Sequence, residues 1–567
     1  MESTSSLRLS SPATFRVKSE TSALAAQASF LAANSEAYEW LVTKVQRLGR
    51  ARNADAVLET VASAARFAAI FHPGRFVDGA IENVALSIGS ELGALVFDGT
   101  LPLPTACRDN RRRVLHVASH VSALGGHSRM LHYWMKHDRS SRHSLVVTNQ
   151  QQASTPAWLR DAARDSGGDV TVLPDAWRVR QKAAWLREAA KRTASLVVLH
   201  HDPFDVVPTV AFARHEGPPV ALLNHADHLF WLGATVSDVV ISLRRAGAEH
   251  ASNRRFAASN VVLPVPLADP ARQVTRQHAR HILGIPEDQV VLLSVGRAEK
   301  YWPCGPYDFV ATAGRLLDRA PRAHLYVVGE SLPGITPHLR SPVHERLHFV
   351  GSVEDPSMYR AAADVYLETF PFGSQTALLE AALNALPVVS AYAPLFPLLV
   401  ANDDAVHERV ANPQSEQEYI ERVVELARNA EQRSAVGNTL RQCLLAGNVG
   451  EGWLDRLGQA YQLTDSATHQ PRTIPISSCR TTDSDIALSM WHVVGDGRTY
   501  SPPSLGDNGR ALLCHSAFVA KEVGNYARAR RLAWRAVRQN PNWPAAWRLL
   551  VLTVVGRAAR LARGVIQ

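Results

Sequence analysis

One segment of the chain combines a strand end, a Pro/Gly turn and a polar helix start: residues 368–380, with the sequence ETFPFGSQTALLE. Gly373 permits a tight turn, and Ser374 is a preferred N-cap residue, followed by Gln375 and Thr376 in the first helical turn. Such a helix start offers free backbone N–H groups and the positive end of the helix dipole to an anion. The segment therefore predicts a diphosphate site, with the hydroxyls of Ser374 and Thr376 beside it.

Glu380 extends the same face of this predicted helix. It lies four residues after Thr376, one turn deeper. A carboxylate at that depth can accept two hydrogen bonds from the diol of a ribose. The alternative is that Ser374 and Thr376 cap a buried helix and that Glu380 is a solvated side chain. The combination of these residues directly after a strand favours nucleotide binding.

A basic segment follows the predicted strand at residues 290–296. Gly296 permits a tight turn there, and Arg297 and Lys300 come next in the chain. A cation at this place can neutralise the charge that develops on a leaving diphosphate, which is electrostatic catalysis without a metal ion. We expect Lys300 to contribute more than Arg297. The alternative is a surface ion pair with Glu299.

A glycine pair occurs in the first half of the chain, after the predicted strand at residues 114–119. Gly125 and Gly126 permit close backbone approach to a ligand, and His127 and Arg129 follow at the start of a predicted helix. That helix start offers further N–H groups to an anion. Because of its place after a strand, the loop is a candidate anion site.

His225 and Asp227 come at the carboxyl end of another predicted strand, next to His228. A histidine can act as general base on an acceptor hydroxyl, with the aspartate orienting the imidazole. The preceding strand ends in a similar cluster, residues 200–202, with the sequence HHD. Two such clusters on neighbouring strand ends also resemble metal ligands. Polar packing and loop capping are the remaining alternative.

No metal site or resident cofactor is predicted. The five cysteines include no CxxC pair, which disfavours a zinc site or a disulfide framework and indicates a reducing compartment. Asp483 and Asp485 form the pattern Asp-x-Asp, but within a segment predicted to be a linker rather than after a strand. Their place in a predicted linker therefore does not indicate a metal site.

The candidate site residues must be positioned by regular elements, and the chain contains many short Val/Leu-rich runs without polar alternation. Such runs are typical of parallel strands covered by helices on both faces. They predict two doubly wound α/β domains, at 111–268 and 285–463, with a cleft between them, because ligands bind at the carboxyl ends of the strands in such sheets. The predicted strands are 114–119, 144–149, 170–173, 196–201, 219–225, 238–242, 261–267, 290–296, 323–330, 346–353, 363–370 and 386–392.

The remainder of the chain is predicted to be mostly helical. Residues 1–20 are Ser/Thr-rich and expected to be disordered, whereas 21–105 have helical periodicity and predict a small helical domain. The Ser/Thr/Pro-rich residues 464–506 are typical of a linker. Residues 507–567 have the helix–turn–helix pattern of a tetratricopeptide-type unit, which must pack against its neighbours or a partner.

The 567 residues carry a net charge of +9, from 61 basic and 52 acidic side chains. This small and scattered excess does not indicate a nucleic-acid partner. The chain has no evident secretory signal and no apolar run long enough to span a bilayer, so a cytoplasmic location is expected. Contact with anionic lipid at the inner face of the membrane, or with a protein partner through the helical ends, stays open.

The donor segment at 368–380 resembles the C-terminal nucleotide-sugar site of GT-B glycosyltransferases, and its TFPF turn is most similar to the O-GlcNAc-transferase-like group. A more distant resemblance is to the retaining glycosyltransferase family 4, with its Glu-x7-Glu motif. The second motif glutamate binds ribose, which implies that role for Glu380. The first glutamate falls on Phe372 here and is absent, and Glu368 is out of register. The stereochemical outcome is therefore left open.

The resemblance covers roughly residues 111–463 and implies a GT-B fold with a donor-binding second domain. It also implies that the glycine-rich loop at residues 125–129 of the first domain faces the donor phosphates and the acceptor. It implies transfer of a sugar from a nucleotide-diphosphate sugar, a UDP-sugar by preference, to a saccharide, lipid-linked or protein acceptor held by the first domain. Two alternatives remain: a nucleotide-sugar epimerase or hydrolase on the same fold, and a catalytically silent binding scaffold.

Overall fold

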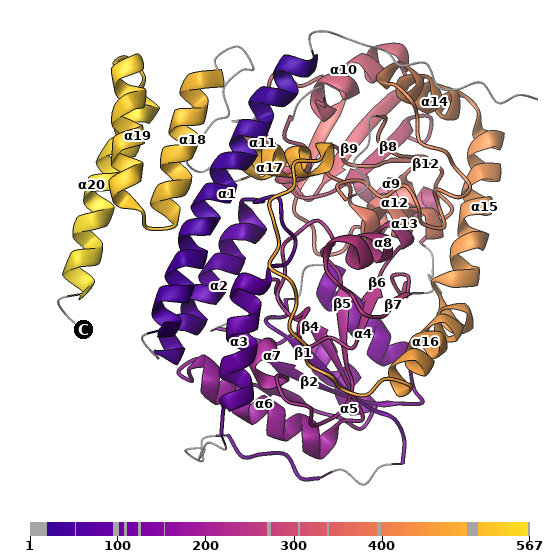
Figure 1. Ribbon diagram of the computed structural model, residues 1–567. Helices are drawn as coiled ribbons and strands as arrows, with labels where there is room; N and C mark the ends of the chain where they lie inside the picture. The colour runs from indigo at the N-terminus through magenta and orange to yellow at the C-terminus, as the bar shows by residue number, and fades with distance from the viewer. Residues whose placement is uncertain are drawn as a thin grey trace, which may run out of the picture.

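Two parallel sheets covered by helices form the centre of the protein, and further helices flank them (Figure 1). Of the predicted tail, residues 1–19 lie outside the described part of the chain, as does Gly125. The computed structural model describes residues 20–50, 53–93, 101–106, 110–122, 126–151, 154–268, 274–303, 307–336, 339–393, 398–495 and 508–564.

The first sheet has seven parallel strands in the order β3-β2-β1-β4-β5-β6-β7. Its central strands are buried along their whole length because helices cover both faces, which explains their unbroken apolar runs. The strands are β1 (Arg113–Ala118), β2 (Arg142–Val147), β3 (Val170–Val172), β4 (Leu196–His200), β5 (Val220–Asn224), β6 (Val239–Ser242) and β7 (Asn260–Val262). Its helices are α4 (Gly126–His137), α5 (Ala157–Asp165), α6 (Val179–Thr193), α7 (Val207–Ala211) and α8 (Arg245–Arg254).

The second sheet has five parallel strands in the order β10-β9-β8-β11-β12. The strands are β8 (Val290–Val295), β9 (Ala323–Val328), β10 (Leu347–Gly351), β11 (Val365–Leu367) and β12 (Val388–Val389). The helices of this part are α9 (Arg276–Leu283), η1 (Ala298–Lys300), α10 (Phe309–Arg319), α11 (Leu332–Ile335), α12 (Ser357–Ala362), α13 (Gln375–Leu383), α14 (Glu416–Arg428) and α15 (Ala430–Gly447). Each predicted run overlaps one of the strands, so the predicted fold class of two doubly wound units is confirmed.

Helices from both ends of the chain pack together beside the sheets. The N-terminal ones are α1 (Glu20–Arg50), α2 (Ala54–Ile70) and α3 (Gly79–Glu91), and the C-terminal ones are α18 (Asn508–Glu522), α19 (Tyr526–Gln539) and α20 (Pro544–Gly564). Figure 1 shows α18 next to α1, with α19 and α20 outside them. The ring of His515 lies 5.1 Å from that of Phe30, and its Nε2 bonds to Asn34 at 2.7 Å. Among the described residues, no helix is both long and apolar enough to cross a membrane.

The domain boundary predicted at residue 463 does not match the way the helices pack on the two sheets. Helix α16 (Gly450–Asp465) follows the second sheet in sequence but packs on the first. Trp453 contacts Trp134 of α4 with ring centroids 6.0 Å apart, and the Trp134 Nε1 donates to the Tyr461 hydroxyl at 3.1 Å. An amphipathic pattern shows that a helix has an apolar face but does not show which sheet covers that face.

Residues 464–506 were predicted to be a linker, but part of this segment is packed against the rest of the protein. Ile474 is buried, and its carbonyl accepts from Asn83 of α3 at 2.8 Å. A helix, α17 (Asp483–Gly495), follows, and Asp485 is buried between His72 at 2.9 Å and Arg254 at 3.0 Å. Ser/Thr/Pro-rich composition disfavours regular structure, but it does not prevent side chains from packing. Residues 496–506 lie outside the described part.

Candidate functional site

The turn after β11 leads into the start of α13, as the donor segment predicted. Ser374 occupies the N-cap position, but its side chain makes no hydrogen bond to the first turn. Instead, the Ser374 Oγ lies 3.2 Å from the Thr369 hydroxyl, which donates to the Phe372 carbonyl at 2.6 Å. The expected capping by the Ser374 side chain is therefore wrong. The Ser374 hydroxyl contacts Thr369, five residues earlier, and does not bind the N–H groups of the first helical turn.

Lys300 lies at this helix start. Its Nζ donates to the Gly373 carbonyl at 2.7 Å and lies 5.0 Å from the centre of the Phe372 ring. Gly296 packs against the same turn, because a Cβ added there would lie 3.0 Å from the Ser374 Oγ and 2.8 Å from the Thr369 side chain. A larger residue would push the two segments apart. The structure thus places an ammonium group beside the N-terminal end of α13.

Arg297 precedes Lys300 in the turn after β8. Its side chain is exposed, while that of Lys300 is partly buried. The side chain of Glu299, the partner in the alternative interpretation, lies outside the described residues. Lys300 contacts the helix-start turn through the Gly373 carbonyl.

Gly126 brings the two halves of the chain into contact. It begins α4, and a Cβ added to it would lie 3.0 Å from the Thr376 Oγ1, in the first turn of α13. The glycine-rich loop of the first unit and the helix start of the second therefore face each other at close range. An alanine at this position would require Thr376 to shift.

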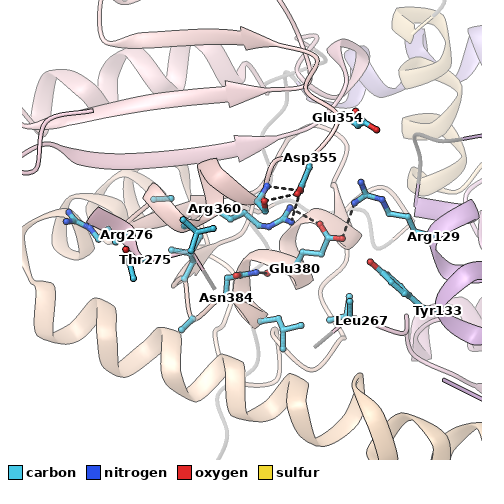
Figure 2. Close-up of a pocket in the computed structure, with 18 of the residues that line it drawn as sticks. Arg129, Tyr133, Leu267, Thr275, Arg276, Glu354, Asp355, Arg360, Glu380 and Asn384 are labelled. Atoms are coloured by element: carbon cyan, nitrogen blue, oxygen red, sulfur yellow. Dashed lines mark hydrogen bonds and ion pairs between the residues drawn. The ribbon is translucent and has the colours of Figure 1, made fainter. Parts of the chain in front are cut away.

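A cavity of about 1050 Å³ adjoins this contact, between α4 on one side and α12 and α13 on the other (Figure 2). Glu380 points into it and accepts from Arg360 at 2.9 Å and from Arg129 at 3.5 Å. Tyr133 of α4 lies beside them, so both units line the space. A carboxylate held between two guanidinium groups is fixed in orientation, and its remaining lone pairs can accept hydrogen bonds from hydroxyl groups.

The predicted pair of His225 and Asp227 is not formed. The Asp227 carboxylate lies 2.9 Å from Arg244, which also reaches Asp403 of the second unit at 3.1 Å. His225 instead donates from Nδ1 to the Leu223 carbonyl at 3.3 Å, and burial lowers its pKa, so its ring is neutral. A buried guanidinium attracts a carboxylate more strongly than a neutral imidazole does, which explains the different partner.

His127 and the histidines and aspartate of residues 200–202 also contact other residues of the first unit. The His127 ring stacks on that of His225 with centroids 4.4 Å apart. His201 donates to the Leu232 carbonyl at 3.0 Å, and Asp202 accepts from His120 at 3.1 Å. Within the described ranges no group of three or more His, Cys, Asp or Glu side chains is arranged to hold a metal ion.

Two residues of the site were not predicted. Arg360, on α12, holds Glu380, and no local pattern links two residues 20 positions apart on different helices. Glu368 directly follows β11 and is fully buried behind the Gly373 turn, and burial raises its pKa to about 7. The signal that the sequence offers for Glu368 is an acidic residue at the end of a predicted apolar strand.

Comparison with known proteins gives one family match. Residues 289–429 match the family model of glycosyl transferases group 1. No curated protein sequence matches the chain significantly.

Similar solved structures include a mutant of the O-GlcNAc transferase of Thermobaculum terrenum, at 17% identity and a TM-score of 0.47, covering 76% of this chain and 82% of that one. Sucrose-phosphate synthase of Thermosynechococcus elongatus is 16% identical, with a TM-score of 0.44 and coverage of 63% and 100%. Alr3699/HepE of Anabaena in complex with UDP and glucose is 15% identical, with a TM-score of 0.44 and the same coverage of 63% and 100%.

The family match includes the turn that carries Lys300, the helix start at Ser374, and Glu380. These are the elements that surround the contact with Gly126 and the adjoining cavity. Residues 289–429 therefore carry a glycosyl transferases group 1 domain, and the two α/β units that face each other have the predicted GT-B arrangement.

Proposed function

We propose that the chain transfers a sugar from a nucleotide-diphosphate sugar to an acceptor hydroxyl without a metal ion. The observation that carries the proposal is the contact between Gly126 and Thr376 beside a cavity that both units line. A donor bound at the start of α13 would present its sugar to the glycine-rich loop of the first unit. The close approach of the two units would exclude water and limit donor hydrolysis.

The donor diphosphate would lie at the helix start, where the N–H groups of α13 and the Lys300 ammonium meet. When the bond from the sugar to the diphosphate breaks, negative charge grows on the leaving oxygen. Lys300 lies where it can leave the Gly373 carbonyl for that oxygen, because a flexible ammonium can exchange a neutral acceptor for a charged one. Arg297 is the second candidate for this role.

The nucleoside would extend into the cavity toward Glu380. Arg360 fixes one oxygen of that carboxylate, and Arg129, at 3.5 Å, holds the other more loosely. A ribose diol can replace the longer contact without leaving the carboxylate unpaired. Uridine is our preferred nucleoside because the donor segment resembles UDP-sugar sites; the acceptor is a saccharide, lipid-linked or protein hydroxyl.

A thermal-shift screen with UDP, GDP, ADP and UDP-glucose tests the donor assignment, because a ligand that binds the native state raises the melting temperature. We expect UDP and UDP-glucose to stabilise the protein more than the purine nucleotides. The control is the Glu380→Ala variant, which should lose most of the shift. A larger shift with GDP or ADP would replace uridine, and no shift with any nucleotide would contradict the proposal.

UDP release from UDP-glucose, with and without an acceptor panel, then separates the alternatives. Release that depends on an acceptor and persists in EDTA supports metal-independent transfer. Release in the absence of any acceptor favours a hydrolase, and binding without release favours a silent scaffold. A strict requirement for a divalent cation would contradict the role given to Lys300.

A further inference from the structure

Three histidines lie side by side across the first sheet. His143, His116 and His200 come from the neighbouring strands β2, β1 and β4, and none is exposed to solvent. The His116 Nε2 lies 3.0 Å from the His143 Nδ1, and the His116 Nδ1 lies 2.9 Å from the His200 Nε2. The three rings therefore form one continuous hydrogen-bonded row through an otherwise apolar sheet.

Asp138 closes one end of this row. The His143 Nε2 lies 3.0 Å from the Asp138 carbonyl and 3.4 Å from its carboxylate. The carboxylate also accepts from the Tyr461 hydroxyl of α16 at 2.6 Å and from Ser140 at 2.7 Å. Burial alone would raise the pKa of Asp138, but the hydrogen bonds from His143, Tyr461 and Ser140 hold it well below its usual range. This end of the row is a fixed negative charge.

The charge at Asp138 determines where the protons sit. Both oxygens near the His143 Nε2 can only accept, so this nitrogen carries the hydrogen. In a neutral row the His143 Nδ1 then accepts from the His116 Nε2, and the His116 Nδ1 accepts from the His200 Nε2. Each ring donates toward Asp138, and the His200 Nδ1 is left with a free lone pair.

The other end of the row reaches the cleft. The His200 Nδ1 is buried and has no hydrogen-bond partner among the described residues, and the same holds for the His127 Nε2. The centroids of the two rings lie 5.8 Å apart, a separation that one bridging water can span. His127 directly follows Gly126, which touches Thr376 at the start of α13. Two buried nitrogens without partners are costly and point to a role.

We propose that Asp138, His143, His116 and His200 form a proton relay that serves the transfer reaction, with His127 as its entrance. The inference rests on the proposed function, since it needs an acceptor hydroxyl that loses a proton. As the acceptor oxygen bonds to the sugar and the sugar–diphosphate bond breaks, the hydroxyl proton passes through His127 to the His200 Nδ1.

Two internal shifts complete the step. The proton on the His200 Nε2 moves to the His116 Nδ1, and the proton on the His116 Nε2 moves to the His143 Nδ1. One proton has entered and no proton has left, so His143 becomes an imidazolium beside the Asp138 carboxylate. After the product leaves, the proton returns to solvent by the reverse path. The positive charge is held far from the sugar and next to the one buried anion of the row.

The surroundings of the row favour a neutral resting state. Burial lowers the pKa of His116, His127 and His200 well below the usual value, and repulsion from neighbouring histidines lowers it further. A row that rests neutral can accept a proton at neutral pH. The other titratable groups that face its open end are His120, His201, Asp202, Asp205 and His225.

The first test uses Asp138→Asn and the milder Tyr461→Phe, which weaken the negative end without touching the cleft. Removing the carboxylate lowers the proton affinity of the row, so kcat for UDP release from UDP-glucose should fall about tenfold or more. The acid limb of the kcat/KM profile should move to lower pH, and donor KM should stay within about twofold. Tyr461→Phe should move both quantities in the same direction by less.

The matched control is His348→Gln, which breaks the 2.9 Å hydrogen bond between His324 and His348 in the second sheet. It should leave the pH profile unchanged. If Asp138→Asn lowers only the melting temperature and leaves the profile unchanged, the row is structural and the relay is wrong.

A second measurement does not depend on activity. In the wild-type protein labelled with 15N-histidine, the relay requires the Nε2–H form for His116, His143 and His200. On acidification the three rings should change together, and Asp138→Asn should shift that joint transition to lower pH. Separate titrations, or mixed tautomers, would overturn the relay. Absence of transfer to any acceptor, with a joint transition retained, would instead contradict the proposed function.

Discussion

The two faces of the cleft carry different kinds of side chain. On the second unit, Lys300 donates to the helix-start turn and Glu380 is ion-paired with Arg360, so this face presents fixed charges. On the first unit, His127 and His225 stack on each other, and burial keeps both rings neutral. Charged groups suit a donor that carries a diphosphate, whereas neutral imidazoles suit an acceptor that must lose a proton. The division of charge between the faces fits the proposed division of roles, in which the second unit binds the donor and the first unit moves the proton.

The largest expected effect is that of Lys300→Ala, which removes the cation at the helix start. We expect kcat to fall by roughly 100-fold or more, as when one group that stabilises transition-state charge is lost. Donor affinity should change only a few-fold, because the α13 N–H groups remain. Steady-state UDP release and calorimetry with UDP measure the two quantities. A larger loss in Arg297→Ala would exchange the two roles, and an unchanged kcat in Lys300→Ala would remove Lys300 from the mechanism.

The second expected effect concerns Glu368, the buried acid behind the charged face. Its pKa is raised by burial from 4.5 to about 7, so the folded protein binds this proton over a pH range where the unfolded chain has lost it. Stability should therefore fall as pH rises from 4.5 to 7, by about 3 kcal/mol in total, and the Glu368→Gln variant should lack this loss.

Urea unfolding at pH 4.5, 6 and 8 measures this difference. The free energy of unfolding of the wild type, relative to that of Glu368→Gln, should decline across the series. The exposed Glu354→Gln serves as the control and should follow the wild type. Parallel pH dependences of the wild type and Glu368→Gln would show that Glu368 titrates normally.

The third expected effect is a loss of nucleotide affinity in Glu380→Ala. A hydrogen bond to a charged group contributes about 1.5–3 kcal/mol, so the Kd for UDP should rise about tenfold or more. Glu354→Ala is the matched control, because Glu354 also lines the cavity but lacks the paired arginines recorded for Glu380. Isothermal calorimetry checks both variants. Equal affinities in Glu380→Ala and the wild type would contradict the ribose role.

The smallest catalytic effect is expected for Asp227→Asn. Asp227 pairs with Arg244 rather than with His225, so the substitution weakens a contact that leads to Asp403 of the second unit. We expect a loss of stability of about 1–3 kcal/mol and an unchanged pH profile of kcat/KM. A shift of the acid limb in Asp227→Asn would restore the pair of His225 and Asp227 as a catalytic dyad.

Much of the fold followed from local patterns. Short apolar runs separated by helical stretches predicted every strand of both sheets, because a strand covered on both faces needs apolar residues at successive positions. The turn and helix start at residues 368–380 could also be predicted, because a strand end, a glycine turn and a polar helix start are neighbours both in sequence and in space. The close approach of Gly126 to Thr376 matched the expectation that the two strand edges face each other.

The partners of the side chains were decided only by the tertiary structure. The Ser374 hydroxyl bonds to Thr369 instead of capping its helix, Asp227 pairs with Arg244, and α16 packs on the first sheet. Each outcome depends on which charge or surface comes closest after the chain has folded.

The histidine row shows this limit most clearly. His116 lies 27 residues from His143 and 84 from His200, and no sequence spacing joins them. Parallel pairing of β1 with both β2 and β4 brings the three rings into hydrogen-bond distance. Local composition by itself determined which segments become strands and helices, because backbone conformation and burial respond to neighbouring residues. Strand order determined which side chains meet, because contacts across a sheet join residues that are distant in the chain.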